Sequence, residues 1–485
     1  MKYRYKIIIL PLLVLMLSAC GNDWLDLQPE SSIDSSIAIE NLTDAEAAVI
    51  GIYSALQSSE YYGGRMTYYG DVIGDDMQSN SDSKRCASFY RYAYTSENAP
   101  RSLWEQPYKV IRLANNILAV IDNIKVLDSE KAKLDNVRGQ ALFFRAMAHF
   151  DVTKVYGYPY AKDNGASWGA SIITTPLDYS AKPERSTVAQ CYDKLIIPDL
   201  VEAVKLLPEK KSDASVGKIT KWGAKLLLSR AYLYKGDNAN ALREAEECIK
   251  GAEKASYSLI ENSKYFTEWM TKYNSESLFE IVNLITDNAG NEGLPYLYWD
   301  RGYDDIIITK SFYSILSSDK KDVRNTLTTK GTKKPSSKKY NCYILKYANT
   351  IDDDIRSSNI IVLRLSEAYL NAAEAAAKVG DNAKAVKYLG AIVTRANSDK
   401  KVTGIVTLSQ VLEERRKELF GEGHRAFDLL RNGLTINRVG SSHSAILPDY
   451  AKSIDWNNFR CVLPIPKYEV NANEAIRQQQ NPGWE

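Results

Sequence analysis

The sequence predicts a mainly α-helical protein whose scaffold is built from helix pairs. Apolar residues recur at three- and four-residue intervals over several long stretches, which is the period of an amphipathic helix. The linker Gly-Asp-Asn-Ala occurs twice between such stretches. Irregular segments rich in Tyr, Gly, Asn and Asp separate the helical ones, so we expect loop-rich and short β insertions on a helical scaffold.

The first residues of the chain have the organisation of a secretory signal peptide. Basic residues precede an apolar run at 7–17, and two small residues follow this run, directly before Cys20. The run is shorter than the roughly 20 apolar residues that a membrane-spanning helix needs. We therefore expect residues 1–19 to be removed and residues 20–40 to form a tether.

A cysteine directly after Leu17-Ser18-Ala19 resembles the lipobox of bacterial lipoproteins. The resemblance implies that Cys20 becomes the first residue of the mature chain and is acylated on its thiol and its amine. Several acyl chains give a lasting membrane anchor, because each buried methylene contributes about 0.8 kcal/mol. The alternative is an ordinary signal peptide with a chance cysteine. No later segment is apolar for long enough to span a membrane.

Composition disfavours several classes of function. Loss of residues 1–19 lowers 62 Lys and Arg to 59, against 60 Asp and Glu, and a nearly neutral protein does not favour a nucleic-acid partner. The three histidines lack metal-ligand spacing and no nucleotide-binding or EF-hand motif occurs, so we expect no metal and no cofactor. The five cysteines after Cys20 form no disulfide pattern, and Cys191 and Cys248 fit buried helix positions.

Tyrosine is unusually frequent. The chain holds 32 Tyr against 10 Phe and 8 Trp. A tyrosine ring has a flat apolar face and a polar tip, which suits contact with sugars or peptides at a half-wet surface. The alternative is that Tyr replaces Phe where helices pack.

The N-terminal part is predicted to alternate helices with loops. Thr43 and Glu46 form a capping-box pattern that starts a helix ending near Leu56. Residues 58–100 lack a sustained period, so we expect loops and short elements there. The helical pattern resumes over 103–124.

A longer helix is predicted by a stripe of apolar residues, which consists of Leu134, Val137, Ala141, Phe144, Ala148 and Val155. Gly157 should end this helix before a loop at 160–185. Thr187 and Gln190 form a second capping-box pattern and start the next helix, which Pro198 should kink.

Two later segments repeat one design. Each has two alanine-rich helical stripes around a linker, and the linkers are Gly236-Asp237-Asn238-Ala239 and Gly380-Asp381-Asn382-Ala383. Glycine stops the first helix and Asp or Asn caps the second. The unit resembles tetratricopeptide pairs, which bury their faces only by stacking. We therefore expect residues 41–485 to form one helical body.

Residues 255–350 differ from the helical scaffold on both sides. They are rich in Tyr, Trp, Gly, Asn and Asp, with short β-type runs at 278–285 and 343–347. Long irregular insertions usually carry binding surfaces. After this insertion, a capping box at Thr407 should start a last strong helix, and the tail from Val462 should lie extended over the body.

These pieces together resemble the SusD/RagB-like family of outer-membrane nutrient-binding lipoproteins. The motifs that carry the resemblance are, in chain order, Trp24-Leu25-Asp26, Gly51-Ile52-Tyr53, Ala141-Leu142-Phe143-Phe144-Arg145-Ala146, Val155-Tyr156-Gly157-Tyr158-Pro159, Arg185-Ser186-Thr187-Val188, Glu414-Arg415-Arg416-Lys417-Glu418-Leu419, Glu422-Gly423-His424-Arg425, Leu463-Pro464-Ile465-Pro466 and Asn481-Pro482-Gly483-Trp484. They occur in the family's order over the whole chain, and the match is weakest at 255–350.

The resemblance implies a mainly α-helical body with about four tetratricopeptide-like pairs. It also implies a place on the outer membrane, through acylated Cys20, facing the cell exterior. There the protein would capture a glycan, without catalytic residues, for a SusC-like TonB-dependent transporter. The alternatives are a peptide ligand on the same scaffold and, less favoured, a tethered hydrolase.

Three patterns invite other chemistry, and each has a structural interpretation that we favour. Glu414 and Glu418 are one helical turn apart, which suits ion pairs along a helix. The segment 165–169 matches Gly-x-Ser-x-Gly, but the nucleophile elbow needs a strand before it and a helix after it. Three aspartates at 352–354 could hold calcium, although a solvated loop is the stronger interpretation.

The ligand-binding candidates are aromatic residues with neighbouring charges, because sugar rings stack on aromatic faces while Arg and Asp hydrogen-bond hydroxyl groups. The central group consists of Tyr296, Tyr298, Trp299, Asp300, Arg301 and Tyr303. The N-terminal group consists of Tyr61, Tyr62, Arg65, Tyr68 and Tyr69. Trp168 and Trp269 are weaker candidates. The alternative for each is loop packing or contact with the transporter.

Overall fold

The computed structural model describes residues 39–484 apart from 211–216, 332–340, 349–353 and 441. Its long helices are α2 (Leu42–Gln57), α5 (Ser102–Val120), α6 (Lys131–Tyr156), α9 (Ile197–Leu206), α10 (Lys221–Lys235), α11 (Asn238–Lys254), α15 (Leu365–Val379), α16 (Asn382–Ala396) and α17 (Leu408–Glu418). Among the described residues, none of the helices has both the length and the apolar character needed to cross a membrane.

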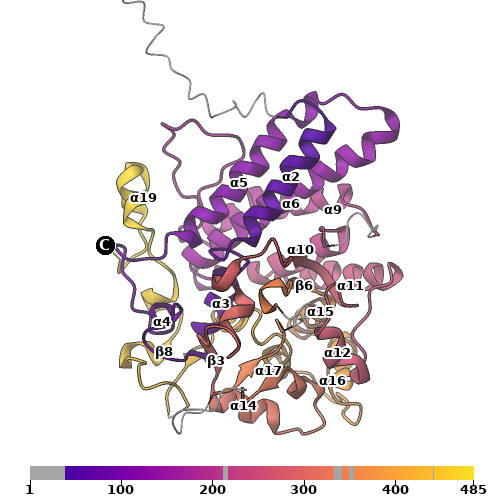
Figure 1. Ribbon diagram of the computed structural model, residues 1–485, viewed down its shortest axis with the longest axis vertical. Helices are drawn as coiled ribbons and strands as arrows, with labels where there is room; N and C mark the ends of the chain where they lie inside the picture. Colours follow the sequence, from indigo (N-terminus) through magenta and orange to yellow (C-terminus); the bar gives the residue numbers. More distant parts are fainter. Residues whose placement is uncertain (1–38, 211–216, 332–340, 349–353, 441, 485) are drawn as a thin grey trace, which may run out of the picture.

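These helices form one continuous stack. The successive pairs α2–α5, α6–α9, α10–α11 and α15–α16 pack internally, and contacts between α5 and α6, α9 and α10, and α11 and α15 join them. Figure 1 shows the stack running from α2 and α5 at the top to α16 and α17 at the bottom. One set of buried side chains extends from Ile39 to Trp484. The mainly α-helical scaffold expected from the sequence is therefore confirmed.

The two Gly-Asp-Asn-Ala linkers fold as their residues require. Gly236 and Gly380 end α10 and α15 in the left-handed conformation, with φ of 82° and 84°. The Asp237 side chain then accepts a hydrogen bond from Asn240 N, and Asp381 accepts one from Lys384 N, so each aspartate caps the following helix.

Gly380→Ala should lower the free energy of unfolding by about 1 kcal/mol, because a Cβ penalises the left-handed conformation. No atom lies within 4 Å of the added Cβ, so the cost comes from the backbone alone. Gly51→Ala is the matched control, since Gly51 lies inside α2 with equally open space and should gain stability from alanine's helix propensity. Urea unfolding of both variants checks this, and effects of the same sign would contradict it.

Helix α6 is more deeply buried than its apolar stripe predicts. All residues from 139 to 153 are buried, including the polar His149 and Asp151. The cause is tertiary, because α2 and α5 pack on α6 from one part of the stack and α9 and α10 from another. Gly157 ends the helix as expected, and its backbone N–H donates to Thr153 O.

One predicted helix start falls differently in the structure, and the helix that starts after Thr187 is divided near the predicted kink. Helix α2 begins at Leu42 and its cap is Asn41, whose Oδ1 accepts from Asp44 N at 3.1 Å, so the expected cap at Thr43 is wrong. Asn is at least as good a cap as Thr, and it stands two residues earlier. Before α9, residues 192–196 form a π-helical turn and Pro198 lies in the first turn of α9, where its missing N–H costs nothing.

The strands are short and form two-stranded antiparallel sheets. They are β1 (Met77–Ser79) with β3 (Ile306–Ile308), β2 (Ser277–Ile281) with β6 (Ile360–Arg364), β4 (Thr328–Thr329) with β5 (Tyr343–Ile344) and β7 (Ile436–Asn437) with β8 (Ser453–Ile454). The predicted β runs at 278–285 and 343–347 are thus partly confirmed. In β1 and β3, Met77 faces Ile308, which ties the N-terminal segment to the insertion.

Short helices fill the loop-rich regions. They are α3 (Arg65–Val72), α4 (Ala87–Tyr90), α7 (Tyr160–Asp163), α8 (Val188–Cys191), α12 (Tyr265–Trp269), α13 (Leu294–Leu297), α14 (Lys310–Ser317), α18 (Arg425–Arg431) and α19 (Lys467–Ala472). The tail after Val462 is therefore not wholly extended, since α19 and a 3₁₀ helix at 474–479 interrupt it. The capping boxes at Thr187 and Thr407 are both present.

Candidate ligand-binding surface

The two aromatic segments singled out in the sequence lie together, although more than 200 residues separate them. Leu294 N, at the start of α13, donates to Gly63 O at 2.8 Å. Tyr298 OH, just after α13, donates to Asp71 Oδ2 in α3 at 2.7 Å. The insertion and the N-terminal segment therefore meet, and we call the part of the molecule that they build the corner.

Most of the aromatic rings at this corner are buried, which corrects the expectation that they face a ligand. The buried rings are Tyr61, Tyr62, Tyr68, Tyr69 and Tyr298. These rings anchor α3 and α13 to the helical stack. For example, Tyr61 OH donates a hydrogen bond to Asp151 Oδ2 of α6 at 2.7 Å. Asp300 is buried as well. Arg65 is engaged with Glu60 and Ser102 and is only half-exposed.

The accessible part of the corner consists of Arg301, Tyr296 and Tyr303. Arg301 is exposed, and none of the ion pairs among the described residues involves it. Its guanidinium lies 4.3 Å from the ring centre of Trp299, which is itself only 8% exposed. Tyr296 and Tyr303 are half-exposed and pack edge to face, with ring centres 4.9 Å apart. Trp299 thus supports Arg301 more than it offers a free face.

Sequence reasoning missed two charged residues at this corner. The Arg85 guanidinium lies 3.9 Å from the ring centre of Tyr303. It pairs with Glu292 and, at 3.3 Å, with Asp305, and the hydrogen bond to Glu292 raises the pKa of Arg85. Arg85 and Glu292 lie in segments without periodicity, so no pattern in the sequence marks them.

The loop that carries the accessible residues closes on itself. Tyr303 N donates to Tyr296 O at 2.8 Å, and Gly302 N donates to Trp299 O at 3.1 Å. A Cβ at Gly302 would lie 2.0 Å from Tyr296 O, so the loop can close only with glycine there. The loop therefore presents Arg301 and two phenol rings in a defined arrangement.

This arrangement suits binding rather than catalysis. Phenol rings offer flat faces to the C–H groups of a sugar, and Arg301 supplies donors for hydroxyl oxygens. Two carboxylates at the corner are held in ion pairs: Glu292 and Asp305 pair with Arg85, and Lys84 lies 3.4 Å from Asp305. Asp71 and Asp300 are buried.

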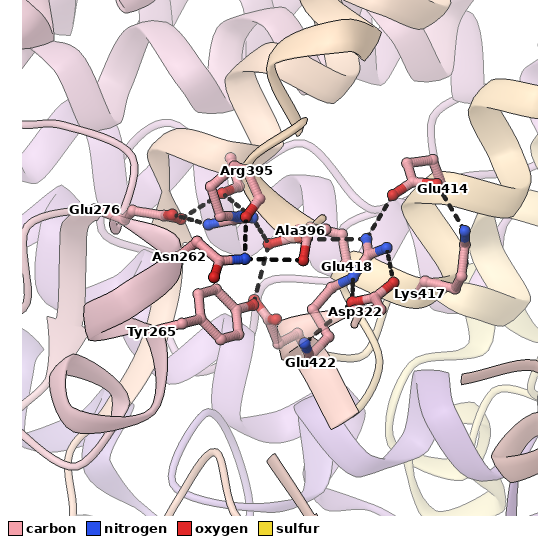
Figure 2. Close-up of polar contacts among 12 residues, drawn as sticks. Asn262, Tyr265, Glu276, Asp322, Arg395, Ala396, Glu414, Lys417, Glu418 and Glu422 are labelled. Carbon is pink, nitrogen blue, oxygen red and sulfur yellow. Dashed lines mark hydrogen bonds and ion pairs between the residues drawn. The ribbon is translucent and has the colours of Figure 1, made fainter. Parts of the chain in front are cut away.

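The charged cluster around Glu414 and Glu418 is a buried structural network. This agrees with the structural interpretation that the sequence favoured over an active site. Figure 2 shows Arg395 between Glu276 and Glu418, both fully buried. Arg395 Nη1 donates to Glu276 at 2.6 Å and Nη2 to Glu418 at 2.5 Å. Burial would raise the pKa of Glu418, but Arg395, Arg364 and other cations lower it well below the usual range. Carboxylates held this way cannot act on a glycosidic bond in a cleft.

The network joins different helices in addition to pairing residues along one helix, as Lys417 does with Glu414. Arg364, at the end of β6, donates to Glu276, Glu418 and Glu422. Arg431 of α18 pairs with Glu374 of α15. The expected pairs along a single helix therefore also reach across the stack, which the sequence could not show.

Asp71 should make stability depend on pH. Burial raises the pKa of Asp71 to about 7, although hydrogen bonds from Tyr298 and Gly423 act in the opposite direction. Because this folded-state pKa lies above the unfolded value of 3.8, the stabilisation is complete below pH 3.8 and is lost as pH rises towards 7.

The test is Asp71→Asn, which cannot titrate. Between pH 5 and pH 8, the parent should lose on the order of 2 kcal/mol of unfolding free energy relative to this variant. Urea unfolding at both pH values measures the difference. Parallel profiles for the two proteins would contradict it.

The other predicted positions do not extend the corner. Trp269 is buried beneath the charged network, whereas Trp168 is 37% exposed elsewhere. The Gly-x-Ser-x-Gly segment at 165–169 follows the short helix α7 and no helix comes directly after it, so it is not a nucleophile elbow.

Two predicted features fall partly or wholly outside the described residues. Cys20, the expected lipid attachment site, lies outside them, as do Asp352 and Asp353. Asp354 binds Arg356 instead of standing free for calcium. In the part of the chain that the structure describes, no group of His, Cys, Asp and Glu could hold a metal ion, and the five cysteines are buried and free.

Comparison with known proteins gives a consistent result over the whole chain. A family model described as starch-binding and associating with the outer membrane matches residues 23–233, and the model of the SusD family matches residues 263–484.

Solved structures agree in fold and sequence. One crystal structure is that of a proposed sugar-binding protein from Bacteroides vulgatus ATCC 8482. It is 46% identical in sequence, with a TM-score of 0.86, and the match covers 92% of this chain and 100% of that chain. A SusD superfamily structure from Bacteroides thetaiotaomicron VPI-5482 is 36% identical, with a TM-score of 0.85 over 91% and 100%. SusD-like protein P2 of Formosa agariphila is 24% identical over 99% of this chain and 100% of its own length.

Proposed function

The chain belongs to the SusD family, and on this basis we propose that it captures an oligosaccharide at the outer membrane and delivers it to a SusC-like TonB-dependent transporter. The observation that carries the proposal is the corner formed by Arg301, Tyr296 and Tyr303 on a scaffold 46% identical to a proposed sugar binder. Membership of the family supports the proposed location, because the family model that matches residues 23–233 is described as associating with the outer membrane.

Binding without cleavage is supported by the chemistry of the surface. At the corner, Glu292 and Asp305 are paired with Arg85 and Lys84, and Asp71 and Asp300 are buried. The carboxylates of the central network are buried among arginines. Hydrolysis of a glycoside needs an acid and a second carboxylate on either side of the bond.

Titration calorimetry of the mature chain tests the ligand class. We expect saturable binding of at least one glycan among neutral glucans and uronate-containing oligosaccharides, with the ligand recovered uncut in mass spectrometry. Binding of peptides alone would favour the peptide alternative, and steady release of shorter sugars would favour the hydrolase.

The anchor and the partner need a test in cells. Cys20→Ser should move the protein from the outer-membrane fraction to the soluble fraction, because the acyl chains are lost. The native protein, purified gently from membranes, should bring a TonB-dependent transporter with it. Membrane attachment of the Cys20→Ser variant would refute the lipid anchor, and recovery without a transporter would refute the partner.

A further inference from the structure

A second groove lies on residues that the corner does not use. It has a volume of about 590 Å³, which is within the usual range for small-molecule sites. Its walls come from α7 and the residues on either side of it, the segment 457–459 and the C-terminal tail. They include Tyr158, Lys162, Asp163, Ser167, Trp168, Asn457 and Phe459. Figure 1 marks the end of that tail at the edge of the molecule.

The groove combines aromatic surface with accessibility. Trp168 is 37% exposed, whereas a soluble protein more often buries most of an indole ring. Phe459 is half-buried and packs edge to face on Trp484, with ring centres 4.6 Å apart. Both residues line the groove, and Trp168 offers it an accessible ring on which a sugar ring can stack.

Hydrogen bonds hold this aromatic wall in place. Arg185, which is buried, donates from Nη2 to Trp168 O at 2.9 Å and from Nη1 to Asn481 Oδ1 at 2.9 Å. Val188 N donates to Ser167 O at 2.8 Å, and Trp168 pairs with Thr187 in a β-bridge. Both sides of the groove are therefore tied to one guanidinium, and binding would cost little ordering.

Two polar groups with unused hydrogen-bonding capacity line the same groove. Lys162 Nζ lies 3.4 Å from the ring centre of Tyr158, and none of the ion pairs among the described residues involves Lys162. Ser167 Oγ is shielded from solvent and has no hydrogen-bond partner in that part of the chain. A shielded hydroxyl without a hydrogen-bond partner lowers stability, and a hydrogen bond to a ligand hydroxyl would remove this penalty.

We propose that this groove is a second saccharide-binding site, with Trp168 as the stacking face and Lys162 and Ser167 as hydrogen-bonding groups. The inference rests on the proposed function and adds to it: one long oligosaccharide, or two separate ones, would contact the protein at two places. Two linked contacts raise the affinity for a long chain well above that for a short one.

The experiment is calorimetry of the full mature chain with glucan and galacturonan oligosaccharides, each as a trisaccharide and as an octasaccharide. Trp168→Ala should weaken binding of the octasaccharide that the parent prefers by about tenfold or should remove one of two binding events. Lys162→Ala should act in the same direction, and more strongly on the galacturonan if Lys162 pairs with a carboxylate. Phe266→Ala, an exposed aromatic residue on α12 outside the groove, is the matched control and should bind as the parent does.

The outcomes separate this inference from the proposed function. If the parent binds an oligosaccharide and Trp168→Ala binds it equally well at both lengths, the second site is refuted while capture at the corner stands. If Trp168→Ala keeps full sugar affinity but loses the transporter in co-purification, the groove is a protein contact and the inference is also refuted. If the parent binds no oligosaccharide at all, the proposed function itself fails.

Discussion

Glu418→Gln should lower the free energy of unfolding by about 3–5 kcal/mol, because it removes one charge from a buried network and leaves its partners uncompensated. Glu418 Oε1 accepts from Arg364 at 2.8 Å and from Arg395 at 2.5 Å, and Arg324 lies 3.3 Å from Oε2. Glutamine keeps the shape of the side chain, so the loss reports the charge. Urea unfolding at neutral pH gives the difference.

The matched control is Glu474→Gln, which removes the same charge from an exposed pair. Glu474 lies 3.9 Å from Arg477 and both side chains are in solvent, so this variant should unfold at the urea concentration of the parent. Equal midpoints for Glu418→Gln and the parent would mean that the network does not hold β6, α16 and α17 together.

Arg301→Ala should weaken oligosaccharide binding by about ten- to a hundredfold, the range expected when a charged hydrogen-bond donor is lost. Arg301 is exposed, and its only described contact is with the ring of Trp299. The fold should therefore be unaffected, and thermal unfolding should match the parent. Calorimetry with the preferred glycan measures the affinity.

Arg243→Ala serves as the control for that prediction. Arg243 is an exposed arginine of α11, where it contacts Glu244 and Asn240 and lies far along the chain from the corner. Its variant should bind the glycan as the parent does. A full-strength complex with Arg301→Ala would show that the ligand binds elsewhere.

The sequence predicts those parts of the fold that local chemistry determines. Gly236 and Asp237 specify a helix stop and a cap through their own backbone and side chain, and the structure has both. The capping box at Thr407 is equally local. The family motifs add the order of the elements, and hence the helical stack.

The candidate site was predicted less completely, because burial depends on what packs against a residue. Tyr69 and Trp299 have the same residue chemistry whether they lie in a core or on a surface. Their burial is determined by the way α3, α13 and β3 pack together. Arg85 became part of the corner through Glu292 and Asp305, more than 200 residues away in the sequence. The abundance of tyrosine therefore reflects packing at least as much as ligand contact.

A crystal structure of the mature protein with its preferred oligosaccharide is the most direct test of capture at the corner. We expect an intact sugar chain within hydrogen-bonding distance of Arg301 and in contact with the rings of Tyr296 and Tyr303. A complex with no sugar at these three residues, or with a cleaved product in its place, would contradict the proposal.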